Sequence, residues 1–413
     1  MHNSLSWNKQ VLSNGLTVLF YPRPHAMTSQ LSLGVKYGSN DDSQDKIGTA
    51  HFLEHMLVGG SPERIKLLHE IESSGGCSYF ETSNEATFSS LNVVPQRLKA
   101  ASKVLSRLFF DKEFEKGKLE LERKVIFNEI AEVSDDPQGQ TEETLLKCLF
   151  KHHPTKNPIL GSKKTVAKLT LTDIDEAHEN YYTPSNIILT LSGRYSKKDV
   201  EAILDNFQNI DGGSPSKRED KNHEESASKK GTSTRKSGIT QSYLSLGLLT
   251  SSITNAEAPV LDLINTILGT GESSRLFVEL REKRGLTYDF DSMNVSGSNY
   301  GYFRVNCATK PKSLEQTREL IRKELKKMSQ FPVMKSELEK CKNLIKANIY
   351  RSFDSSFQLP RLLTELEMYF RQENAVIDYM GRVKSISELN VLEVSAKYFQ
   401  EQNYSEATLL PKK

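Results

Sequence analysis

Two histidines and a glutamate lie within five consecutive residues near the start of the chain. His51 and His55 are four residues apart, and Glu54 directly precedes His55. Each helical residue turns by about 100°, so His55 lies about 40° and Glu54 about −60° from His51. Two imidazoles at this spacing can bind one Zn²⁺ ion, while a carboxylate on the same face can hold a water molecule and take its proton. This spacing favours a catalytic zinc site over the alternative, a solvated helix face with a hydrogen-bonded core histidine.

A catalytic zinc site needs a third protein ligand and one open position. The helix predicted over residues 113–133 offers two carboxylates, Glu122 and Glu129. They are seven residues apart, so they share one face and are separated by about 10.5 Å along the helix axis. We expect only one of them to reach the ion. The other could orient one of the histidines through a hydrogen bond.

The surrounding sequence predicts the elements that must hold these side chains. Helical spacing over residues 47–58 places the two histidines on a helix. Two glycines, Gly75 and Gly76, then interrupt the chain, and residues 78–84 form a predicted edge strand. A substrate backbone can pair with such an edge as an additional strand.

The size and composition of the chain limit the classes of protein it can belong to. Its 413 residues suggest two or three domains, and 55 basic against 53 acidic residues give a net charge of +2. That balance argues against a nucleic-acid partner. We find no apolar run long enough to span a membrane and no signal peptide pattern. The four widely spaced cysteines indicate a reducing compartment. We therefore expect a cytoplasmic protein without a membrane partner.

One long polar segment divides the chain. Residues 212–238 contain no aromatic residue and no Leu, Ile, Val or Met, so they cannot bury enough apolar surface to offset the entropy of ordering. We expect a flexible polar linker whose end could form an edge strand. Residues 1–211 and 239–413 then form two similar α+β domains, each with an antiparallel-rich sheet packed with helices. The first domain carries the zinc motif.

The motif and its surroundings resemble the pitrilysin/insulysin family of inverted-motif (HxxEH) zinc metallopeptidases. The similarity is to the short-chain branch that includes mitochondrial processing peptidase, and it covers nearly the whole chain. The matching segments are the zinc helix, the acidic helix, the approach to a closing strand, and two motifs in the second half, at residues 48–56, 122–129, 181–186, 271–277 and 280–288.

The resemblance implies a role for each candidate residue of the first domain. His51, His55 and Glu129 would bind zinc, one ion per chain. Glu54 would be the general base that activates a water molecule at the zinc, and Glu122 would be an acidic residue near the site.

The second domain contributes a further pair of residues by the same resemblance. Arg281 and Tyr288 would contact carbonyl oxygens of the substrate near the scissile bond. From the residues alone, Arg281 is typical of a solvated helix charge and Tyr288 of a half-buried strand residue. Their functional role is therefore implied by the resemblance.

The resemblance also implies an activity and an assembly. The activity is that of a zinc-dependent endopeptidase acting on peptides or unstructured polypeptide segments inside a chamber. Long family members build this chamber from four such domains, so a two-domain chain is half of it. We expect a homodimer in which Arg281 and Tyr288 of one subunit complete the site of the other. A heterodimer with a related chain and a non-catalytic structural or assembly subunit are the alternatives.

Two segments depart from the family pattern. Tyr79 and Phe80 stand where the family usually has Asn-Ala in the edge strand, and residues 58–61 read Val-Gly-Gly-Ser where it often has Phe-Lys-Gly-Thr. Backbone pairing does not depend on side-chain identity, so strand addition is expected to survive. Hydrogen bonding by the missing Asn side chain is not. We therefore expect the substrate preference to differ from the family more than zinc binding does.

Overall fold

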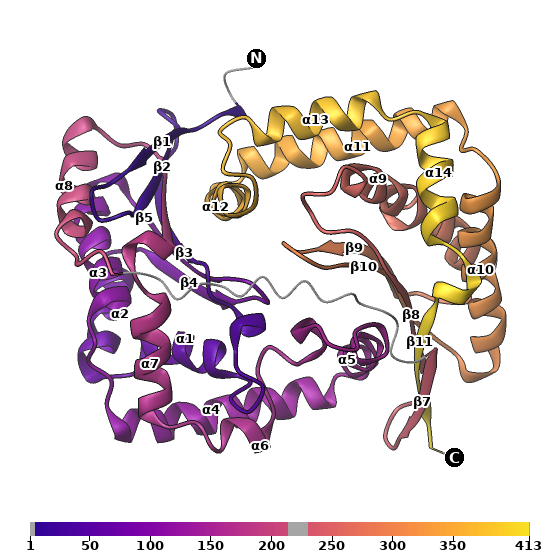
Figure 1. The fold of residues 1–413 in the computed structure, drawn as a ribbon, viewed down its shortest axis with the longest axis horizontal. Helices are drawn as coiled ribbons and strands as arrows, with labels where there is room; N and C mark the ends of the chain where they lie inside the picture. Colours follow the sequence, from indigo (N-terminus) through magenta and orange to yellow (C-terminus); the bar gives the residue numbers. More distant parts are fainter. Residues whose placement is uncertain (1–4, 214–229, 413) are drawn as a thin grey trace. The chain divides into compact units, whose positions relative to one another are not determined.

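The computed structural model describes residues 5–213 and 230–412. Contacts divide the chain into two compact units (Figure 1). Unit 1 takes its described residues from 5–131, 157–213 and 350–377, and unit 2 takes its own from 132–156, 230–349 and 378–412. Each unit combines one β-sheet with several helices, which confirms the predicted α+β class.

The sheet of unit 1 has six strands within the described residues. They are β1 (Asn8–Val11), β2 (Thr17–Pro22), β3 (Ser29–Val35), β4 (Cys77–Thr82), β5 (Thr87–Val93) and β6 (Ile187–Gly193). Their spatial order is β1-β2-β6-β3-β5-β4, with a parallel pair β2–β6 and antiparallel pairs elsewhere. The strand expected over residues 78–84 is thus β4, and it lies at the edge of the sheet as predicted.

Helices cover both faces of this sheet. They are α1 (Thr49–Gly59), α2 (Pro62–Ser73), α3 (Leu98–Phe110), the first part of α4 (Lys116–Asp135), α6 (Lys163–Val166), α7 (Leu171–Tyr181), α8 (Lys197–Gln208) and α12 (Gln358–Phe370). The main apolar core joins the sheet to α1, α2, α3, α7 and α8. Leu33 of β3 points into this core, whereas its neighbour Gly34 faces α12, as the alternation of a strand requires.

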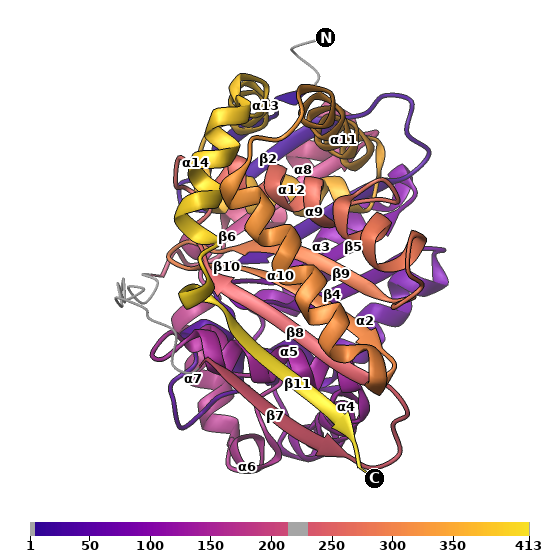
Figure 2. The same ribbon diagram turned by 90° about the vertical axis from the view of Figure 1, so that its right-hand side faces the viewer.

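In the described part of unit 2, the sheet has five strands. They are β7 (Gly231–Lys236), β8 (Ser242–Leu249), β9 (Phe290–Ser296), β10 (Gly301–Thr309) and β11 (Ser405–Pro411). The order β7-β11-β8-β10-β9 has one parallel pair, β7–β11, and Figure 2 shows β7, β11 and β8 side by side. Strands β7 to β11 repeat the pairing of β2 to β6 in unit 1, which confirms two similar domains.

The helices of unit 2 surround a second apolar core. They are α5 (Pro137–Leu149), α9 (Ala258–Gly269), a π-helical turn (Phe277–Glu282), α10 (Leu314–Gln330), most of α11 (Lys335–Asp354), most of α13 (Ala375–Ser385) and α14 (Glu388–Tyr398). Apolar side chains of α9, α10, α11 and α14 meet the sheet in this core. The sequence did not predict β9, β11 or α13, because their short segments lack a clear apolar period.

The two sequence halves exchange one helix each. α5 comes from the first half of the chain but packs on β8 and β11, whereas α12 comes from the second half but packs on β3 and β6. The observed units therefore differ from the domains predicted at 1–211 and 239–413, because residues 132–156 belong to unit 2 and 350–377 to unit 1. The spacing of apolar residues along one helix carries no information about which sheet that helix covers.

Glycine lets each exchanged helix approach its sheet. A Cβ atom at Gly34 of β3 would lie 2.4 Å from Thr364 Cγ2 of α12. A Cβ atom at Gly247 of β8 would lie 2.9 Å both from Leu145 Cδ2 of α5 and from a backbone oxygen. All three distances are shorter than a normal contact between a carbon atom and another carbon or an oxygen. The two glycines occupy the same position, the sixth, in corresponding strands.

The predicted linker lies largely outside the described residues, because residues 214–229 are not described. The end of that segment forms β7, an edge strand, as expected. None of the four cysteines forms a disulfide. Within residues 5–213 and 230–412, no helix is both long and apolar enough to cross a membrane.

Candidate metal centre

Helix α1 places the HxxEH motif along the boundary of the core of unit 1. The helix begins after Gly48, which has a left-handed backbone with φ of 102°. A Cβ atom there would lie 2.8 Å from the carbonyl oxygen of Leu160, so glycine is required on both grounds. Phe52 and Leu53 are fully buried, while His51 and His55 are only partly buried. The apolar side chains of α1 therefore fix the direction in which the two imidazoles project.

A partly buried aspartate caps the N-terminal end of α1. The Asp42 carboxylate accepts hydrogen bonds from the backbone N–H groups of Gly48 (2.8 Å) and Ala50 (3.0 Å) and from the hydroxyl of Tyr37 (2.9 Å). Burial raises the pKa of Asp42 to about 7, and the three hydrogen bonds oppose this rise. Sequence reasoning missed Asp42, because its capping role depends on the loop that folds back before the helix.

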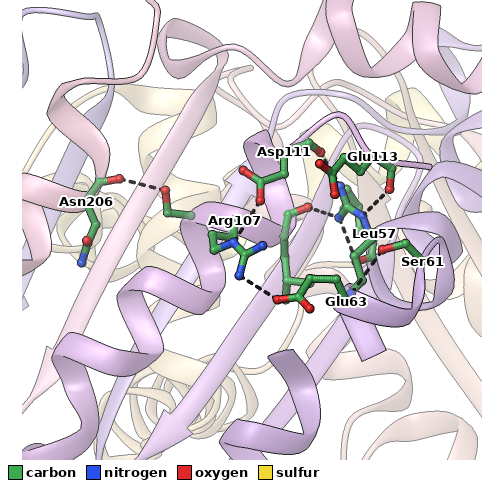
Figure 3. A network of polar contacts seen from close by, with 10 residues as sticks. Leu57, Ser61, Glu63, Arg107, Asp111, Glu113 and Asn206 are labelled. Atoms are coloured by element: carbon green, nitrogen blue, oxygen red, sulfur yellow. Dashed lines mark hydrogen bonds and ion pairs between the residues drawn. The ribbon is translucent and has the colours of Figure 1, made fainter. Parts of the chain in front are cut away.

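A buried arginine binds the other end of α1. The Arg64 guanidinium of α2 donates to the carbonyl oxygens of Leu57 (3.1 Å) and Leu108 (2.6 Å), which joins the last turn of α1 to α3. Figure 3 shows this polar network, in which Ser61 also accepts a hydrogen bond from the Arg64 backbone at the start of α2. Burial lowers the pKa of Arg64 to about 10, so it stays charged at neutral pH. The zinc helix is thus held at both ends.

Helix α4 brings the two candidate carboxylates to α1. Glu129 Oε2 lies 3.6 Å from His51 Nε2 and 3.4 Å from His55 Nε2. Ligand atoms of these three residues lie within 4.8 Å of one another. Two ligands about 2.1 Å from one tetrahedral zinc ion are about 3.4 Å apart, so the separations and the donor set of two imidazoles and one carboxylate fit Zn²⁺.

Glu122 lies behind the site instead of in it. Its Oε2 is 3.1 Å from Nδ1 of His55, the nitrogen opposite the one that faces Glu129. This hydrogen bond fixes which nitrogen of His55 is available to a metal. The two carboxylates that the sequence left as alternatives therefore occupy different positions, with Glu129 among the donor atoms and Glu122 orienting a histidine.

The two histidines differ in their pKa, and therefore in how readily each is neutral for metal binding. Burial, together with the charge of His55, lowers the pKa of His51 to about 3, which keeps it neutral. Burial also lowers the pKa of His55, but the hydrogen bond to Glu122 and the charges of nearby carboxylates raise it by more. Within the described residues, the buried Nδ1 of His51 has no hydrogen-bond partner. Neutral imidazole is the form that binds a metal.

Glu54 is the most buried acid of this group, with 9% of its surface exposed. Burial raises the pKa of its carboxyl to about 7; His55 opposes this, and the charges of Glu129 and Glu81 add to it. A carboxyl in such surroundings can exchange a proton near neutral pH.

A glycine at the end of α1 makes room for Glu122. A Cβ atom at Gly59 would lie 2.1 Å from Glu122 Oε1. Any other residue there would displace this carboxylate from its contact with His55. Sequence reasoning named Gly59 only as a departure from the family pattern, and that departure was the available signal.

Arg281 and Tyr288 lie together in unit 2. The Arg281 guanidinium lies over the ring of Tyr288, 4.4 Å from its centroid, and over the ring of Phe277 at 5.0 Å. Arg281 is on the π-helical turn, where a regular helix was expected. Tyr288 is 82% exposed, so the reading of it as a half-buried strand residue was wrong. The structure thus pairs these two residues, while the metal donors belong to unit 1.

Sequence comparison connects both halves of the chain to one peptidase family. The family model described as "Insulinase (Peptidase family M16)" matches residues 17–163. The model described as "Peptidase M16 inactive domain" matches residues 168–345. The candidate metal donors all lie in the first range. The fold and the HxxEH site together define the class of inverted-motif zinc peptidases. The chain belongs to peptidase family M16.

Relatives with the same overall length support this assignment. A protein of Bacillus subtilis named as an uncharacterized zinc protease, YmxG, is 26% identical over 381 residues, covering 91% of this chain and 89% of its own. An uncharacterized zinc protease of Rickettsia bellii is 29% identical over 348 residues, covering 83% of each chain. The names of these relatives imply zinc and proteolysis for them.

Solved structures share the fold of the whole chain. A protease from Helicobacter pylori has a TM-score of 0.90 at 21% identity and covers 98% of this chain and 99% of its own. A structure from Pseudomonas fluorescens described as a peptidase M16 inactive domain has a TM-score of 0.90 at 21% identity, covering 99% and 98%. A chain of Complex III2 from Candida albicans has a TM-score of 0.83 at 15% identity, covering 98% and 95%. At these identities the likeness concerns the fold alone.

Proposed function

We propose that this chain is a zinc-dependent endopeptidase that hydrolyses peptides or unstructured polypeptide segments. One observation carries the proposal: donor atoms of His51, His55 and Glu129 lie within 4.8 Å of one another on the helix pair that also holds Glu54. Membership of a zinc peptidase family supports it. Each role below is part of the proposal.

The three donor residues would hold one zinc ion per chain. When bound, zinc lowers the pKa of a water molecule and polarises a carbonyl group. Glu122 keeps His55 in the required orientation through its hydrogen bond to Nδ1.

Glu54 carries the proton through the reaction. Its carboxylate takes a proton from the attacking water as the oxygen forms a bond to the scissile carbonyl carbon. When the carbon–nitrogen bond breaks, the same carboxyl returns that proton to the leaving amine. The substrate backbone would pair with the free edge of β4 as an additional strand, which holds an extended segment and excludes folded ones.

A test of this function compares wild type with Glu54→Gln on a quenched peptide library, both loaded with zinc. We expect the variant to retain zinc at about one ion per chain and to lose hydrolysis by roughly a thousandfold or more. Glu70→Gln is the matched control, because Glu70 is an exposed glutamate of α2. The proposal fails if the zinc-loaded wild type cleaves no peptide that Glu54→Gln leaves intact.

We further propose a homodimer in which Arg281 and Tyr288 of one subunit bind substrate carbonyls in the site of its partner, which closes a chamber. Mixed dimers test this arrangement. Glu54→Gln and Tyr288→Phe would each be nearly inactive alone, and mixing them would restore part of the activity, since one intact site forms per mixed dimer. Light scattering must also report two chains. An active monomer, or no recovery from subunits shown to exchange, would contradict the homodimer.

A second candidate function is that of a non-catalytic structural or assembly subunit. The fold shared with a chain of Complex III2 and with a protein described as an inactive domain favours it. The presence of the complete donor set in unit 1 favours the enzyme. A zinc-loaded chain that cleaves nothing and co-purifies at a fixed ratio with a related chain would support the subunit instead.

A further inference from the structure

The outer face of β4 differs from what the family pattern predicts. β4 pairs only with β5 among the described strands, so its other edge has backbone groups available for pairing. Successive residues of a strand point to opposite faces. Phe80 packs against the main core of unit 1, so Tyr79 and Glu81 share the other face. Tyr79 stands where the family usually has a small polar asparagine.

Helix α12 lines this face of β4. The ring of Phe357, the residue directly before α12, meets the ring of Tyr79 edge to face at 5.3 Å. One turn further, Arg361 forms an ion pair with Glu81, two residues further along β4. The order of these contacts shows that the start of α12 runs along β4. The ion pair therefore joins the first turn of α12 to the face of β4 that carries Tyr79.

The two rings remain open to solvent. Tyr79 is 41% exposed and Phe357 is 50% exposed. Because the two rings meet edge to face and both keep exposed surface, a third apolar group can pack against the pair. The contact therefore forms a small apolar surface beside a free strand edge.

This surface lies near the proposed base. α1 packs against β4, and the charges of Glu54 and Glu81 interact, since Glu81 contributes to the rise in the pKa of Glu54. Burial and the hydrogen bond to Glu81 raise the pKa of Tyr79, and the charge of Glu54 adds to this rise. A peptide held along β4 would thus pass both the aromatic pair and the candidate metal centre of the same unit.

We propose that Tyr79 and Phe357 form an apolar subsite that selects a large apolar side chain, aromatic or branched aliphatic, in a peptide strand added to β4. The occupant must be an extended chain, because only an extended backbone can use the free edge of β4. A side chain directly opposite Tyr79 would lie about 5 Å from it, within reach of both rings. The proposal deepens the proposed function and rests on it for its role in substrate choice.

Binding to an inert enzyme tests the subsite without cleavage. The full-length, zinc-loaded Glu54→Gln chain is titrated into fluorescein-labelled twelve-residue peptides of Ser, Thr and Gly with one Leu, Phe, Ala or Lys, and the anisotropy is measured. We expect the Leu and Phe peptides to bind about 10-fold more tightly than the Ala peptide. Adding Phe357→Ala or Tyr79→Ala should reduce that preference to less than about twofold, and Tyr79→Phe should keep it.

The matched control is Met27→Ala, which removes an exposed apolar side chain between β2 and β3 (79% exposed) and should leave the preference unchanged. Equal binding of Leu, Phe and Ala peptides overturns the subsite, as does a preference that survives both Phe357→Ala and Tyr79→Ala. The peptide preference could depend on both rings while the zinc-loaded wild type cleaves no peptide. That result would support the subsite and refute the endopeptidase proposal.

Discussion

The helices α1 and α9 occupy corresponding places in the two units but carry different chemistry. Each follows the central strand of its sheet, β3 or β8, packs against the edge strand, β4 or β9, and ends at a glycine. α1 presents the HxxEH motif. α9 instead carries Asp262, whose carboxylate accepts hydrogen bonds from Asn294 (2.9 Å) and from the hydroxyl of Tyr379 (2.8 Å).

The difference shows what the repeated framework supplies and what it does not. The framework places a helix against an edge strand in both units. In unit 2 the acidic side chain of that helix is satisfied by two neutral donors, which gives it a structural role. In unit 1, and nowhere else in the described residues, three metal donors gather around one point. Function therefore depends on the side chains placed on the fold.

The largest expected effect concerns zinc. His55→Ala removes one of three protein donors and should weaken zinc binding by roughly a thousandfold, measured by competition with a chromogenic chelator. Asp262→Asn, on the corresponding helix of unit 2, should keep the zinc content of wild type. Equal losses of zinc affinity in the two variants would mean that zinc binding depends on the fold in general. The proposed difference between α1 and α9 would then be wrong.

The next effect concerns the glycines beneath the exchanged helices. A larger residue at either glycine should destabilise the two units to a similar degree. Gly34→Val pushes α12 from its sheet and Gly247→Val pushes α5 from the other, so each should lower the free energy of unfolding by about 3 kcal/mol. Urea denaturation measures the loss, and hydrogen exchange should rise in α12 or α5 respectively. Gly117→Ala is the control, since a Cβ there meets no atom within 4 Å. Stability like that of the control would show that these contacts are loose.

Acid should destabilise unit 1, because it contains a buried neutral histidine, His178 of α7. Its Nε2–H donates to the Phe109 carbonyl oxygen at 2.8 Å, and burial lowers its pKa from 6.5 to about 4. Between these values the unfolded chain binds a proton that the folded chain does not, so stability falls as pH decreases from 6.5 to 4. This histidine accounts for a loss of up to about 3 kcal/mol.

His178→Gln should remove that part of the pH dependence, measured by urea denaturation at pH 7, 5.5 and 4.5. His69→Gln, at an exposed histidine of α2, should keep the wild-type dependence. Identical slopes in all three chains would indicate that His178 is hydrated or already charged in the folded protein.

The smallest effect concerns the support of the metal site. Gly59→Ala should displace the Glu122 carboxylate from His55 and weaken zinc binding about 10-fold. Combining it with Glu122→Ala should cost little more than either change alone, because both break the same hydrogen bond. Gly269→Ala at the end of α9, where a Cβ would meet Ser292 Oγ at 1.9 Å, should alter stability without altering zinc affinity. Additive effects of the first two changes would separate Gly59 from Glu122.

The sequence predicted the zinc helix because its evidence is local. Positions 51, 54 and 55 need only a regular helix to share a face. The choice between Glu122 and Glu129 depended on how α4 crosses α1, and no spacing within one helix contains that information. Asp42, Arg64 and Gly59 were missed for the same reason, since each acts on a neighbour that only the folded chain provides.

The same limit applies to the fold. Strand and helix order along the chain predicted two similar domains, and the polar segment 212–238 marked a division between their sheets. This segment did not mark the full boundary between the units. A change in composition shows which segment cannot form part of an apolar core. Which core a helix joins depends on contacts between residues distant in sequence. The aromatic character of Tyr79 was visible, but its partner Phe357 lies 278 positions away.

The reciprocal crossing of α5 and α12 has a consequence for the origin of the chain. If a half-length ancestor had this topology, the helix that corresponds to α5 and α12 could have covered its own sheet or that of an identical neighbour. The present chain has the arrangement that the second choice would give if two copies were joined into one polypeptide. Gene fusion would then have converted a domain-swapped pair into a single polypeptide whose halves cannot be inherited, expressed or replaced separately. One half could lose its metal donors and still be retained, because its exchanged helix covers the sheet of the other half.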